Sequence, residues 1–102
     1  MNVALYFGSF NPIHAGHMII AGQALKQKEI DEVWFVVSPQ NPFKKEETLL
    51  NARNRLHMVR SAIEGLDGFR ASDIEFNLPK PSYTATTLKY LGEKYPNHQF
   101  SI

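Results

Sequence analysis

Short apolar runs alternate with longer stretches of mixed polarity along the whole chain. Residues 3–7 and 33–37 are nearly continuous apolar runs, which is typical of strands buried on both faces. Residues 69–76 alternate loosely and predict a third strand, and residues 98–102 begin a fourth. Trp34, in the second run, is expected to belong to the core rather than to a stacking platform, and so is Phe35.

Three stretches between the predicted strands carry apolar residues at helical spacing. These positions are Ile20, Ala21, Ala24 and Leu25 in residues 16–28, then Leu56, Val59, Ile63 and Leu66, then Leu88, Leu91 and Tyr95, which share one face of the third helix with Thr84. Gly65 and Gly68 close the second helix, and Ser82 or Thr84 is placed to cap the third. The order β-α-β-α-β-α-β predicts an α/β fold, a parallel sheet with helices on both faces.

Ligands of such sheets bind beyond the carboxyl ends of the strands. The chemically unusual residues of this chain occur there, in residues 8–17, 38–45 and 79–84. The polar segment 38–51 is long for a connection between regular elements, and loops of that length are more often functional than idle.

Composition limits the function classes. The chain has 102 residues, which fit one domain, and a net charge of +1, which argues against a general binder of nucleic acid. The absence of cysteine excludes disulfides and a thiol nucleophile. The first residues show no secretion signal, and no apolar run approaches a membrane span, so we expect a cytoplasmic protein without membrane contact.

Residues 8–17 are the first candidate site. His14 and His17 stand three apart at the start of a predicted helix, where free N–H groups and two imidazoles can bind phosphate oxygens. The alternatives are that His14 caps the helix and His17 fills a gap in the core, or that the pair binds a metal, for which no third ligand is evident. Over the whole ten-residue segment we favour phosphate binding.

This segment, G-S-F-N-P-I-H-A-G-H, resembles the pattern G-x-F-x-P-x-[HT]-x-G-H of the nucleotidyltransferase superfamily. The resemblance implies a Rossmann-like fold and nucleotidyl transfer from a nucleoside triphosphate with Mg²⁺. It implies that His14 and His17 are catalytic and contact the triphosphate of ATP. It also places Gly8, Ser9 and Phe10 at the nucleotide, through the loop backbone.

Three further segments narrow the resemblance. Residues 38–44 resemble the P-x-x-P-[HF]-K loop of bacterial nicotinate-nucleotide adenylyltransferases, residues 81–88 their S-Y-T-x-x-T-L segment, and residues 55–58 their R-x-x-M helix start. Phosphopantetheine adenylyltransferase shares only the first motif. The expected reaction is in-line attack by a phosphate oxygen of nicotinate mononucleotide on the α-phosphorus of ATP, which releases pyrophosphate and needs no general base.

The resemblance implies that Lys44, Arg55, Ser82, Tyr83 and Thr84 bind nicotinate mononucleotide. The start of a helix leaves N–H groups that can receive the nicotinate carboxylate, although a plain N-cap explains Ser82–Thr84 equally well without the resemblance. A solvated loop explains Lys44, and an exposed arginine on a helix surface explains Arg55, on sequence grounds alone.

Members of the resembled family continue past a fourth strand into a G-x-D segment and an I-S-[ST]-x-x-R motif. We therefore expect residues 1–102 to be the N-terminal part of a single nucleotidyltransferase domain. The unpaired edge and uncovered face of such a truncated sheet invite self-association, as a homo-oligomer, or aggregation. A nucleotidyltransferase for nicotinamide mononucleotide or phosphopantetheine, and a nucleotide-binding module without activity, are the alternative functions.

Overall fold

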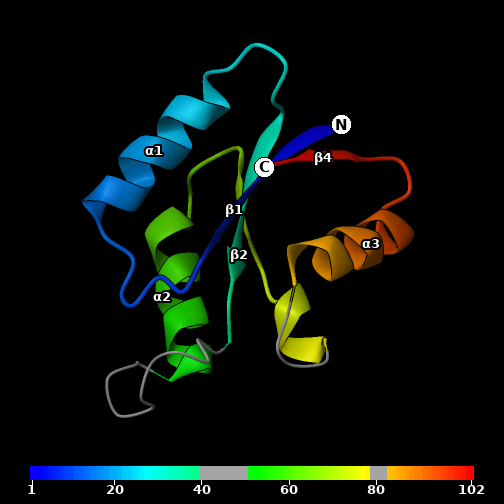
Figure 1. Cartoon of the computed structure of the whole chain (residues 1–102). Coiled ribbons are helices and arrows are strands. Elements are labelled where there is room, and N and C mark those ends of the chain that lie inside the picture. Colours follow the sequence, from blue (N-terminus) through cyan, green and yellow to red (C-terminus); the bar gives the residue numbers. More distant parts are fainter. Residues whose placement is uncertain (40–50, 79–82) are drawn as a thin grey trace.

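The computed structural model describes residues 1–39, 51–78 and 83–102 (Figure 1). The strands are β1 (Asn2–Gly8), β2 (Glu32–Val37), β3 (Phe69–Ser72) and β4 (Gln99–Ser101). The helices are α1 (Ala15–Leu25), α2 (Ala52–Ile63) and α3 (Thr84–Lys94), and a short 3₁₀ helix, Ile74–Asn77, follows β3. The predicted order of strands and helices is confirmed. Among the residues so described, no helix has the length and apolar character that a membrane span requires.

The sheet is parallel throughout, with the strand order β3-β2-β1-β4. β1 and β2 pair from Val3 with Glu32 to Gly8 with Val37. The chain moves outward from β1 through β2 to β3 and then crosses back to place β4 on the other side of β1. Because the direction of travel reverses beside β1, the carboxyl end of β1 is a switch point, where open parallel sheets bind ligands.

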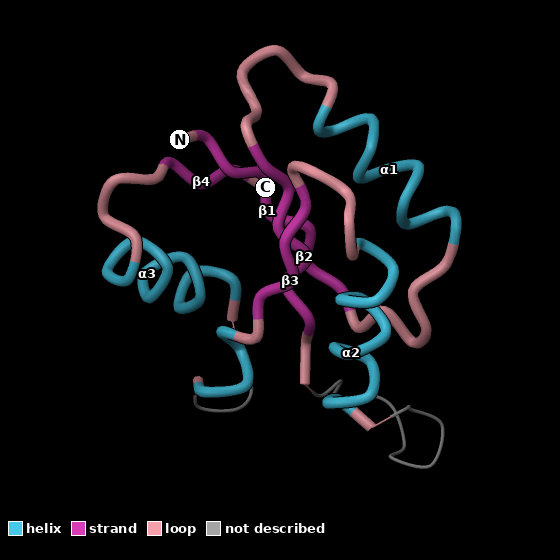
Figure 2. Tube along the Cα trace, turned by 180° about the vertical axis from the view of Figure 1, so that it is seen from behind, coloured by secondary structure: helices cyan, strands magenta, loops and turns pink. Residues whose placement is uncertain are grey.

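Helices cover both faces of the sheet, as the pattern predicts (Figure 2). One core, between the sheet and helices α1 and α2, contains Phe10, Ala21, Val33, Phe35, Val37, Leu56, Val59 and Ile63. The other, beneath α3, contains Val3, Leu5, Trp34, Val36, Ile74 and Leu91. β2 contributes to both cores because it is a central strand, which explains its continuous apolar run.

The predicted strand over residues 69–76 is wrong in its second half. β3 ends at Ser72, whose hydroxyl oxygen accepts the N–H of Ile74 at 3.3 Å, and the carbonyl of Asp73 accepts the N–H of Phe76 at 2.9 Å. These local hydrogen bonds turn the chain into the 3₁₀ helix, because a serine side chain offers the backbone a partner other than the sheet.

Two apolar residues assigned to helical core faces lie outside the core. Leu66 is 48% exposed, since α2 ends at Ile63 and Gly65 adopts a φ of +78°. Ile20 is 56% exposed on α1. The prediction that glycine closes α2 is confirmed, and it excludes Leu66 from the helix.

Candidate nucleotide-binding site

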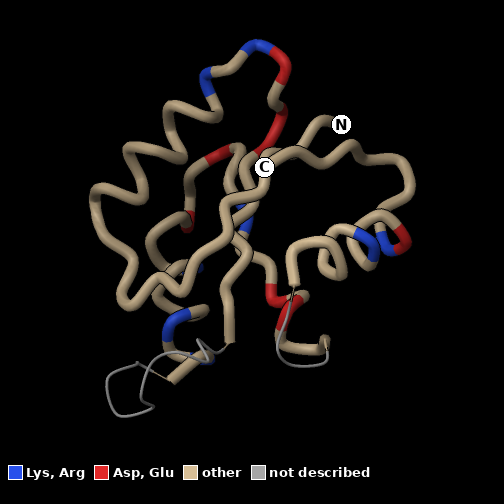
Figure 3. The backbone as a smooth tube through the Cα atoms, viewed as in Figure 1, with Lys and Arg blue, Asp and Glu red and all other residues tan. Residues whose placement is uncertain are grey.

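The loop between β1 and α1 surrounds a hollow of about 330 Å³ at the switch point of the sheet. The loop from Gly8 to Asn11 lines it together with His14 and His17. Residues 8–17 contain no Lys, Arg, Asp or Glu, so the loop is uncharged, whereas the charged residues are spread over other elements (Figure 3). An anion in this hollow would therefore be held by neutral donors rather than by a basic surface.

Phe10 anchors this loop to the core. Its backbone has a φ of +48°, a left-handed conformation that costs a bulky side chain roughly 1–2 kcal/mol. Its ring is only 2% exposed and contacts the rings of Tyr6, at a centroid distance of 5.3 Å, and Phe35, at 5.4 Å. Burial of a phenylalanine side chain contributes roughly 1.5–3 kcal/mol, enough to offset that strain. The predicted contact of Phe10 with nucleotide can therefore involve its backbone but not its buried ring.

His14 and His17 hold one another through reciprocal backbone hydrogen bonds. His14 is the N-cap of α1, and its Nδ1 accepts the N–H of Gly16 at 3.0 Å. The Nδ1 of His17 accepts the N–H of His14, also at 3.0 Å. The two imidazoles stack at a centroid distance of 3.8 Å, and the ring of Phe10 meets that of His17 edge-on at 5.0 Å.

These bonds assign the tautomer of both imidazoles. An Nδ1 that accepts an N–H carries no proton, so the proton of each neutral ring is on Nε2. Burial, and secondly repulsion from His14, lower the pKa of His17, which keeps its ring neutral at pH 7. The site thus offers a ligand two neutral Nε2–H donors from one stacked pair.

The capping alternative for His14 is confirmed, and it changes the expected chemistry of the helix start. The N–H of Gly16 is bound by His14 Nδ1, and the N–H of His17 by the carbonyl of His14 at 3.1 Å. The prediction that these N–H groups are free for an anion is therefore wrong. Capping and phosphate binding remain compatible, because capping uses Nδ1 whereas the donor offered to a ligand is Nε2–H.

The glycine between the two histidines makes room for the imidazole of His14. A Cβ added at Gly16 would lie 2.9 Å from the Cε1 of His14, which is too close for the ring to stay where it caps the helix. Gly22, in the same helix, has nothing within 4 Å of such a Cβ and provides a matched control.

We expect Gly16→Ala to be less stable than Gly22→Ala by about 1 kcal/mol, the usual value of an N-cap side chain. Both substitutions gain helix propensity, so the difference between their urea unfolding free energies isolates the displaced cap. Equal stabilities of the two variants would show that the imidazole of His14 moves without cost.

Arg55 lies beneath the site and not on a helix surface. It is 1% exposed, so the interpretation as an exposed arginine is wrong. Its guanidinium donates to the carbonyls of Ser9 at 2.6 Å, Ser38 at 2.7 Å and Pro39 at 2.9 Å. Burial lowers the pKa of this group. Its buried position favours contact with the protein backbone over the predicted contact with nicotinate mononucleotide.

Of the other predicted acceptor residues, Tyr83 and Thr84 lie at the start of α3, and Lys44 and Ser82 lie outside the described residues. Thr84 is the first residue of the helix and not its cap. Tyr83 is the N-cap, its side chain makes no capping hydrogen bond, and it is 65% exposed.

A buried polar pair, missed at the sequence level, supports the start of α3. The Oε2 of Glu75 lies 2.9 Å from the Oγ1 of Thr87, which lies 3.2 Å from the carbonyl oxygen of Tyr83. Glu75 is 5% exposed and Thr87 is fully buried. The signal available in the sequence was a single carboxylate between two apolar neighbours, Ile74 and Phe76.

Burial raises the pKa of Glu75, and the hydrogen bond from Thr87 lowers it by less. A carboxyl group whose pKa is higher in the folded than in the unfolded chain contributes stability that is complete below its unfolded value, about 4.3. That stability is lost as the pH rises through the folded pKa.

We expect Glu75→Gln, which cannot ionise, to become progressively more stable than the unaltered chain as the pH rises from 4 to 7. Unfolding free energies across this range measure the difference. Glu93→Gln, an exposed position on α3, is the control and should leave the pH profile unchanged. Parallel profiles of Glu75→Gln and the unaltered chain would contradict the prediction.

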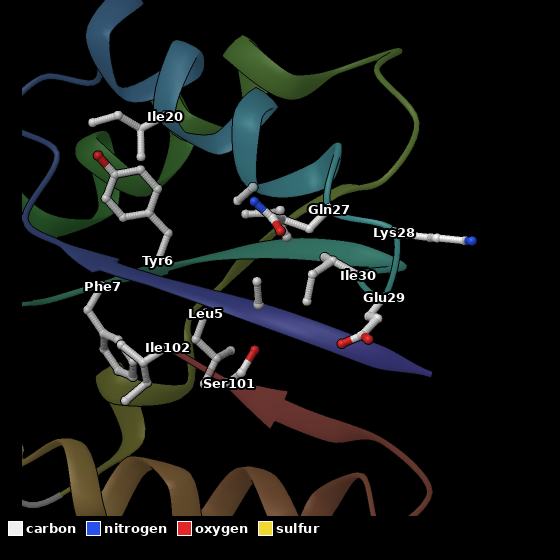
Figure 4. A pocket seen from close by; sticks show the side chains of 13 residues that line it. Leu5, Tyr6, Phe7, Ile20, Gln27, Lys28, Glu29, Ile30, Ser101 and Ile102 are labelled. Atoms are coloured by element: carbon white, nitrogen blue, oxygen red, sulfur yellow. The ribbon is translucent and has the colours of Figure 1, made fainter.

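A larger hollow of about 770 Å³ lies along the edge of β1 (Figure 4). β4 pairs only with Asn2–Ala4, and the hollow follows the next residues of β1, with Tyr6 and Ile20 on one side and Ile102 on the other. Its side chains are mostly apolar and offer few donors to a triphosphate. The smaller hollow beside the histidines therefore fits the predicted phosphate chemistry better.

Comparison with known proteins finds relatives that are described as nucleotidyltransferases. Residues 5–97 match the family model described as cytidylyltransferase-like. The chain is 58% identical over 102 residues to a probable nicotinate-nucleotide adenylyltransferase of Cytophaga hutchinsonii, covering 100% of this chain and 53% of that protein. A protein of the same description from Flavobacterium johnsoniae is 53% identical, with the same coverage. The chain thus spans about half the length of these curated relatives.

Solved structures show the same fold. A nicotinic acid mononucleotide adenylyltransferase of Plasmodium falciparum, complexed with NaAD, superposes with a TM-score of 0.78 at 24% identity. The superposition covers 97% of this chain and 49% of that one. The sheet and its helices therefore have the architecture of this Rossmann-like enzyme.

Proposed function

The chain belongs to the cytidylyltransferase-like family, and on that premise we propose that the protein transfers the adenylyl group of ATP to nicotinate mononucleotide. The products are nicotinate adenine dinucleotide and pyrophosphate. The observation that carries the proposal is the stacked pair of His14 and His17, with both Nε2–H donors available at the switch point of the sheet.

Two neutral imidazole donors suit the triphosphate of ATP. Negative charge moves onto the pyrophosphate oxygens as the bond to the α-phosphorus breaks, and fixed hydrogen-bond donors stabilise that charge. The stack, the two backbone bonds and the Phe10 contact hold the rings before a ligand arrives, so little reorganisation is needed. The attacking phosphate oxygen is already an anion, so we assign no general base.

We propose that Mg²⁺ enters the site with ATP as part of the substrate. Within residues 1–39, 51–78 and 83–102, no three His, Asp or Glu side chains converge in a way that could hold a metal. The ion would then be ligated by phosphate oxygens, where it neutralises charge during transfer.

The acceptor is proposed to bind at the loops that follow β2 and precede α3. Identity of 58% and 53% to proteins described as nicotinate-nucleotide adenylyltransferases supports nicotinate mononucleotide as the acceptor. The helix start at Tyr83 and Thr84 offers backbone N–H groups to its carboxylate, and Lys44 and Ser82 are the further proposed contacts.

An assay of the chain with ATP, Mg²⁺ and one acceptor at a time tests the proposal. We expect formation of the dinucleotide from nicotinate mononucleotide in preference to nicotinamide mononucleotide or phosphopantetheine. Calorimetry with ATP runs in parallel. ATP binding without turnover would identify a binding module, and consumption of another acceptor would identify a different nucleotidyltransferase.

A further inference from the structure

Arg55 joins the two loops that form the candidate site. It shares one face of α2 with Val59 and Ile63, which are four and eight residues further on, and all three side chains are buried. Whereas the two apolar residues pack in the core, the guanidinium of Arg55 reaches the carboxyl ends of β1 and β2.

The hydrogen bonds divide between the two loops. The Nη1 of Arg55 donates to the Ser9 carbonyl after β1 and to the Ser38 carbonyl after β2, and its Nη2 donates to Pro39. The partners are 46 and 17 residues away in sequence, so one rigid planar group fixes the separation of two distant segments. Bonds of 2.6 and 2.7 Å are short, as expected for charged donors.

We call Arg55 and its three hydrogen bonds to these loops the clamp. The clamp acts on the site without entering it. Ser9 lines the hollow beside the histidines, whereas Arg55 does not. On the far side, Ser38 and Pro39 are the first residues of the segment 38–44, which resembles the acceptor loop of nicotinate-nucleotide adenylyltransferases. The N–H of Ser38 also donates to the carbonyl of Gly8 at 2.9 Å, so the same two loops meet at a second bond.

We infer that Arg55 is a positioning residue that couples the nucleotide loop after β1 to the loop after β2. Occupation of one loop then stiffens the other, so the two ligands bind cooperatively. The cooperative part of this inference rests on the proposed function, whereas the clamp itself does not.

Amide hydrogen exchange on the ligand-free chain tests the clamp. We expect Arg55→Lys, which keeps the charge but loses the planar fork, to speed exchange at the Ser38 amide at least tenfold. Val59→Ala, a buried change on the same face of α2 that removes none of the three hydrogen bonds of Arg55, is the matched control. Equal acceleration of Ser38 exchange in both variants would overturn the inference.

A second measurement needs no variant. In the unaltered chain, the guanidinium protons of Arg55 should exchange with water much more slowly than those of exposed Arg53, observed by NMR. Equally fast exchange of the two groups would also refute the clamp, even if Arg55→Lys fails to fold.

Calorimetry tests the cooperative part. The α,β-methylene analogue of ATP, which cannot release pyrophosphate, should bind severalfold more tightly in the presence of nicotinate mononucleotide, and this enhancement should vanish in Arg55→Lys but persist in Arg53→Lys. Enhancement retained in Arg55→Lys would contradict the coupling. If the unaltered chain binds neither ligand, the proposed function fails, while the exchange measurements still decide the clamp.

Discussion

Replacement of His17 by alanine is expected to lower the rate of adenylyl transfer by more than about tenfold, with a modest effect on folding. The substitution removes one Nε2–H donor and the stacking partner of His14, 3.8 Å away. It also leaves the N–H of His14 without its Nδ1 acceptor. The ring of His14 keeps its bond from the Gly16 N–H but loses the stacked imidazole that also holds it, so transition-state stabilisation falls by more than one hydrogen bond.

Turnover with ATP and nicotinate mononucleotide, measured beside a thermal melt, checks this prediction. His57→Ala, an exposed position on α2, removes an imidazole away from the hollow and should retain full activity. Near-normal turnover in His17→Ala would reject the assigned role. If the unaltered chain binds ATP without turnover, the same comparison is made on ATP affinity.

The pH dependence of His17 provides a second readout of the same geometry. Its pKa is lowered in the folded chain, so the unfolded chain takes up the proton first, near pH 6.5. The stability contributed by neutral His17 is therefore complete above that pH and is lost as the pH falls through the folded pKa. Protonation at Nδ1 also breaks the bond from His14, so ATP affinity should fall in the same range.

Replacement of Phe35 by alanine is expected to cost 3–5 kcal/mol of folding free energy, the usual range for a buried phenylalanine. Phe35 is fully buried in the central strand, stacks on Tyr6 at a centroid distance of 5.5 Å and touches the ring of Phe10. Because a domain of this size has a total stability of about 5–15 kcal/mol, the loss is a large share of it.

Urea unfolding measures this loss, and Leu66→Ala, at a position 48% exposed, is the control. The substitution also removes packing that holds Phe10 in its left-handed conformation, so ATP affinity should fall at temperatures where the variant is folded. A loss below 1 kcal/mol would mean that the surrounding rings collapse into the cavity.

The prediction of the fold succeeds where the evidence is local. The apolar runs at 3–7 and 33–37 predict β1 and β2, and the glycine at 65 predicts the end of α2. The prediction fails where local hydrogen bonds compete with strand pairing, as at Ser72, where the chain leaves the sheet. Periodicity describes which residues prefer burial, but not where a serine side chain turns the backbone.

The candidate site also has features that the sequence predicts and features that it does not. The spacing of His14 and His17 predicts that they act together at a helix start, and the structure brings them into a stacked pair. The spacing does not predict that each Nδ1 accepts a hydrogen bond from a backbone N–H, because that depends on the orientation of the rings. Gly16 permits the orientation that His14 adopts. Residues 38–44 and 81–88 resemble acceptor-binding segments, which is an observation on the sequence. Lys44 and Ser82 lie outside the described residues, so their contact with the acceptor is a proposal.

The sequence by itself determined the order of the elements, the two-sided core and the position of the uncharged loop after the first strand, because each follows from spacing along a few turns or strands. The strand order, which makes that position the switch point, came from the tertiary structure. Only the tertiary structure decided the environment of the buried charges. Arg55 follows the pattern of a surface arginine, yet carbonyls 46 and 17 residues away surround it. Glu75 is buried because Thr87, on another helix, offers it a hydroxyl. The free energy of a buried polar group depends on partners brought together by folding, and no local pattern specifies them.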